Sequence, residues 1–247
     1  MEHLEGRQSI LSALQARQRR FEVILLKHGS HEDKLADVLT LAAERNVPVR
    51  RVDGRELDDL AHGATHGGIL AIVSSKPRLT ADELIAILDT LQEAPLLLLL
   101  EGIEDARNLG FTLRSAEALG VHAVLIKKHL WDFDAIEIAR PASGAYERLP
   151  LVQIEDVEPL QQLRRRGIRL LGCLAGVRST IYQTNLRAAS IIAIGGEKRG
   201  LSGAVREICD DFMTIPSRPG AASLSLSHAA SIVMAEAMRQ RLVLCVG

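Results

Sequence analysis

Short apolar runs that alternate with helical patterns limit the possible folds of this chain more than any other feature of its sequence. In the C-terminal part, five mostly apolar runs are expected to form strands, at residues 96–100, 123–126, 169–174, 191–194 and 212–215. Helical patterns lie between them, near residues 109–119, 159–166 and 201–208. Continuous apolar strands, each followed by a helix, are typical of a parallel sheet covered by helices on both faces. We therefore expect an open, mostly parallel α/β sheet in this part of the chain.

The N-terminal part repeats this alternation on a smaller scale. A helix opens the chain, and strands are expected at residues 23–26, 47–52 and 69–73. Pro77 lies in a linker, and Thr80 is the expected N-cap of the next helix, with Glu83 completing a capping box. The predicted organisation is a small α/β domain at 1–75, a linker and first helix at 76–95, and a larger domain at 96–247.

The composition and the first residues of the chain narrow the class of protein. The apolar run at 96–100 ends at Glu101, far short of the roughly 20 residues that a membrane span needs. The first residues lack the apolar core of a signal peptide, so we expect a cytoplasmic protein with no membrane partner. The three cysteines are far apart and fit neither a disulfide framework nor zinc-ligand spacing, so no metal site is expected. A net charge of −1 gives no overall sign of a nucleic-acid partner, although arginines at 17–20 and 164–166 could form local basic patches.

Polar side chains gather in loops that follow the predicted strands. Asn108 is either a cap of the helix expected from Leu109 or a site residue, and Arg114 could hold a phosphate or order a reacting hydroxyl. Glu197 comes after two glycines and is either an anchor inside a site or a solvated carboxylate. Ligands bind beyond the carboxyl ends of the strands in open parallel sheets. These loops are therefore the expected site.

A third loop contains side chains that invite comparison with serine hydrolases. Ser223, Ser225, Ser227 and His228 lie close together in the sequence. The G-x-S-x-G elbow of those enzymes is missing, and Ser227 and His228 would point in different directions on a helix. We therefore expect a packed or surface histidine and helix-capping serines. The second loop, GGEKRG, does not fit the G-x-G-x-x-G pattern, which disfavours a dinucleotide-binding fold.

Taken together, the three loops resemble a known family. NLGFTLRSAEALG, IGGEKRGLS and IPSRPGAASLSLSHAASI look like the three signature motifs of the SpoU (TrmH-like) RNA 2′-O-ribose methyltransferases of the SPOUT superfamily. PASGAYERLPL is similar to a further segment of that family, and EGRQSILSAL and HGGILA resemble its small substrate-binding domain. The resemblance implies a deep trefoil knot in the C-terminal sheet, a homodimer formed through the C-terminal domain, and S-adenosylmethionine as cofactor.

The resemblance also implies roles for single residues. The expected catalytic residues match the family's motifs in sequence and are Asn108, Arg114, Glu197, Ser223 and Ser225. The expected cofactor-binding residues are Gly176, Gly196, Ile215, Ser223 and Leu224. Ser225 stands where the family usually has asparagine, and a hydroxyl offers fewer donors than an amide. If that asparagine positions a reacting group, Ser225 needs a water or a neighbouring side chain to do the same work.

The expected function is therefore transfer of a methyl group from S-adenosylmethionine to a ribose 2′-oxygen of structured RNA, ribosomal rather than transfer RNA. The alternative is an RNA-binding protein that keeps the fold but has weak or lost catalysis, and Ser225 is its support. Arg114 is expected to act electrostatically, because a guanidinium does not lose its proton at ordinary pH. His66 and the arginines near 17–20 are candidate RNA contacts in the N-terminal domain.

Overall fold

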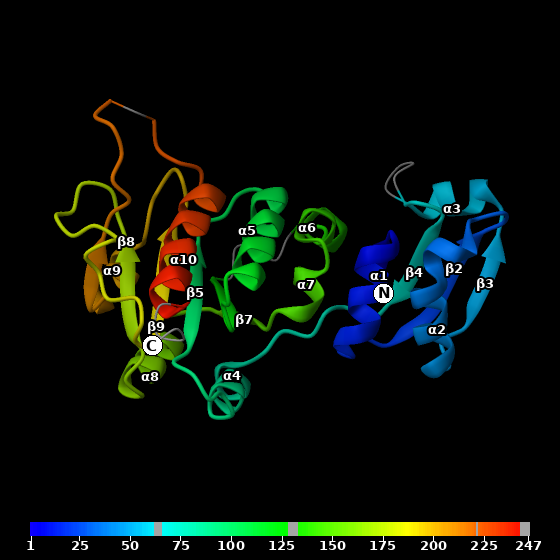
Figure 1. Cartoon of the computed structure of the whole chain (residues 1–247), viewed down its shortest axis with the longest axis horizontal. Coiled ribbons are helices and arrows are strands. Elements are labelled where there is room, and N and C mark those ends of the chain that lie inside the picture. The colour runs from blue at the N-terminus through cyan, green and yellow to red at the C-terminus, as the bar shows by residue number, and fades with distance from the viewer. Residues whose placement is uncertain (62–65, 128–132, 221, 243–247) are drawn as a thin grey trace. The chain divides into compact units, whose positions relative to one another are not determined.

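The computed structural model describes residues 1–61, 66–127, 133–220 and 222–242, which group into two compact units (Figure 1). The N-terminal unit contains Met1–Pro77 together with Asp134–Arg148. The C-terminal unit contains Arg78–Phe133 and Leu149–Gly247. Each unit is thus built from two separate stretches of the chain. No helix in the described part of the chain is long and apolar enough to cross a membrane.

The N-terminal unit is a four-stranded mixed sheet covered by helices. Its strands β1 (Glu2–Glu5), β2 (Phe21–Lys27), β3 (Val49–Val52) and β4 (Ile69–Val73) lie in the order β1-β4-β2-β3. β4 is antiparallel to β1 and β2, whereas β2 and β3 are parallel. The helical elements are α1 (Arg7–Ala16), η1 (Glu32–Leu35), α2 (Ala36–Glu44), α3 (Gly54–Leu60), α6 (Ala135–Ala142) and α7 (Ala145–Arg148). Apolar residues of α1, α2 and one face of the sheet form its main core.

The C-terminal unit is a six-stranded, wholly parallel sheet. Its strands β5 (Leu96–Glu101), β6 (Ala123–Lys127), β7 (Leu151–Ile154), β8 (Arg169–Cys173), β9 (Ser190–Gly195) and β10 (Asp211–Met213) lie in the order β10-β8-β9-β5-β6-β7. Every pairing is parallel. The central strand β5 is buried along its whole length, which explains its unbroken run of leucines. The predicted α/β sheet is confirmed, and β7 is a strand that the apolar runs did not reveal.

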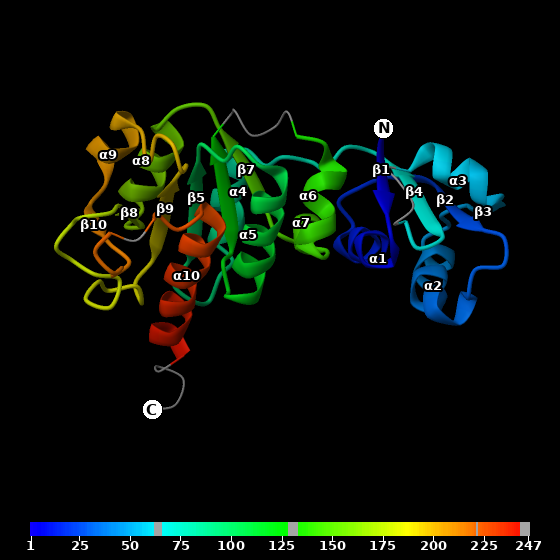
Figure 2. The ribbon, with the colours of Figure 1, turned by 90° about the horizontal axis from the view of Figure 1, so that it is seen from above.

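Helices cover both faces of this sheet. α4 (Ala81–Leu88), α8 (Glu158–Arg165) and α9 (Gly203–Ile208) share one apolar core with the sheet. α5 (Ala106–Ala118) and the long C-terminal α10 (Leu226–Leu242) pack against each other, and α10 also contacts β9 (Figure 2). α10 therefore brings the end of the chain back from the edge strand β10 to the centre of the sheet. The trefoil knot stays a prediction.

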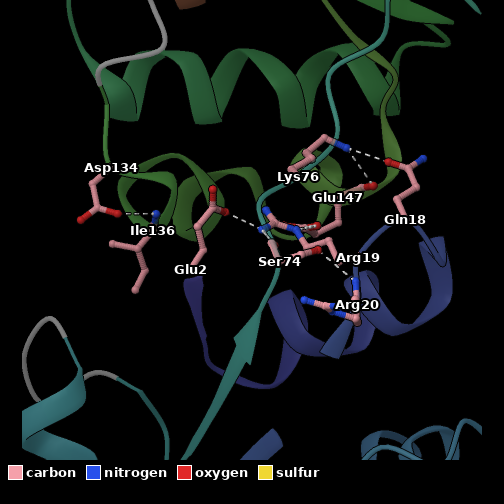
Figure 3. Close-up of polar contacts among 9 residues, drawn as sticks. All are labelled: Glu2, Gln18, Arg19, Arg20, Ser74, Lys76, Asp134, Ile136 and Glu147. Carbon is pink, nitrogen blue, oxygen red and sulfur yellow. Dashed lines mark hydrogen bonds and ion pairs between the residues drawn. The ribbon is translucent and has the colours of Figure 1, made fainter. Parts of the chain in front are cut away.

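Residues 134–148 pack within the N-terminal unit, although the sequence assigned them to the larger domain. α6 contacts β1, and α7 contacts α1. Figure 3 shows the polar part of this packing, in which the Arg19 guanidinium donates to Glu147 at 2.7 and 2.9 Å. Arg19 also pairs with Glu2. An ion pair between two buried side chains thus binds α7 to the rest of the unit.

Two of the candidate RNA contacts in the N-terminal unit are buried and paired within the protein, which disfavours them. Arg19 is 6 % exposed and is engaged by Glu147, so its guanidinium faces the interior. His66 is 5 % exposed, and its Nε2 lies 2.8 Å from Asp58 Oδ1. Both side chains serve the packing of the unit. Arg164, Arg165 and Arg166, the other basic cluster, pair with Asp210, Glu158 and Asp89, respectively.

Candidate functional site

The candidate site lies at the carboxyl ends of the two central strands, β5 and β9. These strands are paired as far as Glu101 and Gly195, so the loops that follow them leave the sheet side by side. A Cβ atom on Gly196 would lie 2.2 Å from the carbonyl oxygen of Gly102. Glycine at position 196 therefore allows the second loop to lie directly against the first.

Glu101 ties these loops to the end of the sheet. Its carboxylate accepts hydrogen bonds from Lys127 Nζ and from the backbone N–H of Ser202, both at 2.7 Å. Burial acts to raise the pKa of Glu101, but these donors outweigh it and the pKa lies below its usual value. The carboxylate stays charged at neutral pH and fixes Ser202, the N-cap of α9. It is a structural residue at the base of the site.

A cleft of about 350 Å³ opens beside the ends of β8, β9 and β10. It is lined by Cys173, Leu174, Ala175, Ile194, Gly195, Gly196, Glu197, Thr214, Ile215, Ser217, Ala222, Ser223, Leu224, Leu226 and Ala229. This volume is in the range of small-molecule sites, and small and apolar side chains leave backbone groups accessible, as a nucleoside-sized cofactor needs. Burial raises the pKa of Cys173 to about 11, so its sulfur stays a thiol and does not compete as a nucleophile.

The residues predicted to bind the cofactor fall into two groups. Gly196, Ile215, Ser223 and Leu224 all line the cleft. Gly176 is not among the described residues that line it and lies in the turn after β8, where its φ of 78° is one that glycine adopts without strain. The neighbouring residue, Ala175, lines the cleft instead.

A smaller cavity of about 80 Å³ borders this cleft on the side of α5. It is lined by Gly102, Ile103, Glu104, Asp105, Asn108, Glu197, Lys198 and Leu226. Glu197 and Leu226 line both spaces. A cleft with a mainly apolar wall thus adjoins a cavity with amide, carboxylate and ammonium groups. This arrangement suits a reaction between a cofactor and a polar acceptor.

Asn108 lines this cavity and is not the cap of its helix. α5 begins at Ala106, earlier than predicted, and Asp105 is its N-cap, accepting from the Asn108 backbone N–H at 2.9 Å. The Asn108 side chain is therefore available, and its Oδ1 accepts a hydrogen bond from Ser227 Oγ at 3.2 Å. The prediction that Asn108 could cap the helix is wrong because an aspartate three residues earlier does so.

Glu197 anchors the start of α10. Its Oε1 accepts a hydrogen bond from the backbone N–H of Leu226, the first residue of that helix, at 3.2 Å. The first N–H groups of a helix have no partner inside the helix, and a negative charge there is favourable. Both readings of the sequence are met in part, because the carboxylate is exposed to solvent and also accepts this hydrogen bond. The neighbouring Lys198 pairs with Glu104 across the cavity's rim.

Ser225, Ser227 and His228 form a connected set of hydrogen bonds at the first turn of α10. Ser225 Oγ lies 2.5 Å from His228 Nδ1 and 3.1 Å from Ser227 Oγ. Ser227 in turn reaches Asn108. The His228 side chain is at the surface, as expected, but one ring nitrogen is engaged. Ser227 had no predicted site role. It lies one helical turn before Ser231, which bonds Ser115 of α5, and this serine spacing is the feature that marks the face of α10 turned toward α5.

Arg114 lies apart from these contacts. Its side chain is exposed on α5, and within the described residues it lines neither the cleft nor the small cavity. Ser223 lines the cleft but takes no part in the hydrogen bonds of Ser225. Of the predicted catalytic residues, Asn108 and Glu197 therefore share the small cavity, Glu197 and Ser223 share the cleft, and Ser225 reaches Asn108 through Ser227.

Comparisons with known proteins place this chain among RNA methyltransferases. The model of the SpoU rRNA methylase family matches residues 95–235, and that of the RNA 2′-O ribose methyltransferase substrate-binding domain matches residues 3–79. The chain is 34 % identical to the 23S rRNA (guanosine-2′-O-)-methyltransferase RlmB of Vibrio vulnificus over 98 % of each chain. It is 32 % identical to RlmB of Pseudomonas aeruginosa over 97 % of each.

Solved structures agree in fold over nearly the whole chain. A crystal structure of an RNA 2′-O ribose methyltransferase has a TM-score of 0.79 and 27 % identity, covering 97 % of this chain and 88 % of that one. The SpoU methyltransferase AviRb from Streptomyces viridochromogenes in complex with AdoMet has a TM-score of 0.80 and 25 % identity. The match covers 97 % of this chain and 90 % of that one. The chain belongs to the SpoU rRNA methylase family.

Proposed function

We propose that this protein transfers a methyl group from S-adenosylmethionine to a ribose 2′-oxygen of 23S ribosomal RNA. The names of its RlmB relatives and the bound AdoMet of the AviRb structure support the substrate and the cofactor. The structural observation that carries the proposal is that the cleft and the small cavity adjoin each other at the ends of β5 and β9. Glu197 and Leu226 separate a cofactor-sized cleft from a polar cavity.

The residues of the cleft fit the proposed cofactor. Backbone groups at Gly196, Ile215 and Leu224 would hold its adenine and methionine parts, with Ser223 beside them. When bound, S-adenosylmethionine supplies an electrophilic methyl group on a positively charged sulfur. The thiol of Cys173 is neutral at physiological pH, so the cleft offers no competing thiolate acceptor there.

Catalysis would depend mainly on placing the ribose hydroxyl. The Asn108 amide and the Glu197 carboxylate line the polar cavity and could orient the nucleotide. Holding two reactants in line removes much of the entropic cost of their encounter. Arg114 would bind the phosphate next to the target ribose and stabilise developing negative charge, because its guanidinium stays protonated. Its exposed position on α5 leaves it accessible to RNA.

A homodimer through the C-terminal unit is part of the proposal. Phe111 is 51 % exposed on α5, one turn before Arg114. Aromatic side chains are enriched at protein–protein interfaces relative to the rest of the surface. We expect a dimer in analytical ultracentrifugation that Phe111→Glu dissociates. A cytoplasmic location fits an enzyme whose substrate is ribosomal RNA.

The test is transfer of labelled methyl groups to separately purified 23S, 16S and transfer RNA. We expect a 2′-O-methylated nucleotide in 23S RNA, located by nuclease digestion. Arg114→Ala should lower kcat by about a hundred-fold, within the range for loss of one electrostatic stabiliser. Arg206→Ala serves as the control. It removes the same charge from α9, a helix that packs into the apolar core shared with α4 and α8.

The outcomes separate the two functions that the sequence left open. Cofactor binding without transfer to any RNA would contradict the proposal and favour an RNA-binding protein that has lost catalysis. In that case Ser225→Asn, which restores the family's usual residue, is the variant that should create activity. Equal losses in Arg114→Ala and Arg206→Ala would contradict the role given to Arg114.

A further inference from the structure

A chain of hydrogen bonds leads from a surface histidine to the polar cavity. It runs from His228 Nδ1 to Ser225 Oγ at 2.5 Å, to Ser227 Oγ at 3.1 Å, and to Asn108 Oδ1 at 3.2 Å. Ser227, in its middle, is 7 % exposed, so its hydroxyl has little access to water. A buried hydroxyl needs partners inside the protein. The inner part of the chain, from Ser225 through Ser227 to Asn108, is therefore partly buried, whereas the bond between Ser225 and His228 is exposed.

With the Asn108 oxygen as the acceptor at one end, the number of available protons gives this chain one direction. Each serine hydroxyl has one proton to donate. Ser227 donates its proton to Asn108 Oδ1, so Ser227 Oγ can only accept from Ser225. Ser225 then has no proton left for the imidazole, and the bond to His228 must be donated by the ring. If the ring accepted from Ser225 instead, Ser227 would have to donate to Ser225, and only a reversed Asn108 amide, donating its N–H to Ser227, would complete the chain.

This direction also fixes the Asn108 amide. Its oxygen is occupied by Ser227, which leaves the two N–H donors of the same amide for other partners. Asn108 lines the polar cavity, where the proposed function places the ribose. Ribose and phosphate oxygens are acceptors, so an amide held this way presents donors of the right kind. A reversed amide would present an acceptor instead.

We propose that His228 is a positioning residue for methyl transfer, which acts through Ser225 and Ser227 to hold the Asn108 amide with its N–H donors free for the RNA. This inference rests on the proposed function. It also identifies the neighbour that Ser225 needs in place of the family's asparagine. Ser225 and His228 together offer a donor and an acceptor, as a single amide would.

The kinetic test compares His228→Ala in two backgrounds. In the native background, we expect kcat for methyl transfer to 23S RNA to fall by about five-fold, the rate equivalent of one net hydrogen bond. The dissociation constant for S-adenosylmethionine and the KM for RNA should be unchanged. In a Ser225→Asn background, an amide N–H, unlike a freely rotating hydroxyl, can donate to Ser227 without a ring N–H to orient it. The same His228→Ala change should then cost less than about two-fold, because the two sites are coupled.

A merely structural histidine gives a different result. It would lower the unfolding midpoint and kcat alike in both backgrounds, with no rescue by Ser225→Asn. A five-fold loss that persists in the Ser225→Asn background, or no loss in the native one, would overturn the inference while leaving the proposed function intact.

A second measurement does not depend on activity. Heteronuclear NMR of the histidine ring nitrogens, assigned with His228→Ala, reports which nitrogen carries the proton. We expect a protonated Nδ1 in His228 of the wild-type protein. An unprotonated Nδ1 would refute the relay even if methyl transfer is confirmed. A protonated Nδ1 in a protein that methylates no RNA would support the relay and refute the proposed function.

Discussion

At the scale of single residues, Glu197 stabilises the start of α10, and this contribution can be measured separately from any role in catalysis. Its carboxylate accepts from the Leu226 N–H, one of the unpaired donors at the start of α10. Glu197→Ala removes both the acceptor and the charge, so we expect the free energy of unfolding to fall by about 1 kcal/mol, as for loss of an N-cap. Glu197→Gln keeps an acceptor and should cost less than half as much. Urea denaturation measures both.

The control for this prediction is another glutamate in the neighbouring loop. Glu104 is exposed and pairs with Lys198, and an ion pair of this kind contributes about 0–1 kcal/mol. Glu104→Ala should therefore change the unfolding free energy less than Glu197→Ala does. Equal stability of Glu197→Ala and the wild type would show that the carboxylate does not anchor α10.

Residue types and motifs predicted which residues share a cleft better than they predicted the contacts of those residues. Gly196, Ile215, Ser223 and Leu224 were placed by their motifs, and all line one cleft. The partners of Asn108 could not be predicted, because its bond to Ser227 joins two helices that are far apart in the sequence. A helix start can also shift by a few residues without changing the apolar pattern. This shift is why Asp105 and not Asn108 caps α5.

At the scale of elements, α7 is held by a lysine whose burial has a measurable cost. Lys76 Nζ donates to the Glu147 carbonyl oxygen at 3.2 Å and lies 5.7 Å from the centre of the Tyr146 ring. Burial lowers the pKa of Lys76 to about 8 from its usual 10.5. Between these two pH values the unfolded chain binds more protons than the folded one. This group therefore makes the protein more stable as the pH rises through that window.

Lys76→Met removes this dependence while filling a similar volume. We expect the unfolding free energy of the wild type, relative to Lys76→Met, to rise by a few kcal/mol at most between pH 7 and pH 10. Urea denaturation at both pH values measures the difference. Lys34→Met, in an exposed lysine of the same unit, controls for loss of a surface charge. A relative stability that falls with pH would contradict the assigned direction.

Helices and strands with a strong local signal were predictable, and those fixed by distant contacts were not. Thr80 and Glu83 form the capping box that their spacing predicts, since both bonds are made within one turn. β7 has a glutamine in a four-residue strand at the edge of the sheet, which is too short a pattern to recognise. α6 and α7 depend on packing against β1 and α1, more than a hundred residues earlier in the chain.

At the scale of the whole molecule, the two units are not consecutive along the chain. Residues 134–148 belong by contact to the N-terminal unit, although they lie inside the part that matches the SpoU methylase family. Ile136, Ile138 and Tyr146 are each at most 5 % exposed in that unit. No periodicity in the sequence predicts which unit these residues join, because a helix with one apolar face can pack on either unit. Cutting the chain at the linker would therefore separate α6 and α7 from their partners.

A fragment of residues 78–247 tests this organisation directly. Without β1 and α1, the apolar side chains of α6 and α7 lose the surface that covers them, and Glu147 loses Arg19. We expect the fragment to bind S-adenosylmethionine, because the cleft is formed wholly by the C-terminal unit, but also to bind a hydrophobic dye and to aggregate with concentration. The same fragment with Ile136→Gln and Ile138→Gln should bind less dye and stay dispersed. A native fragment that is dye-free and dispersed would show that residues 134–148 do not need the N-terminal unit.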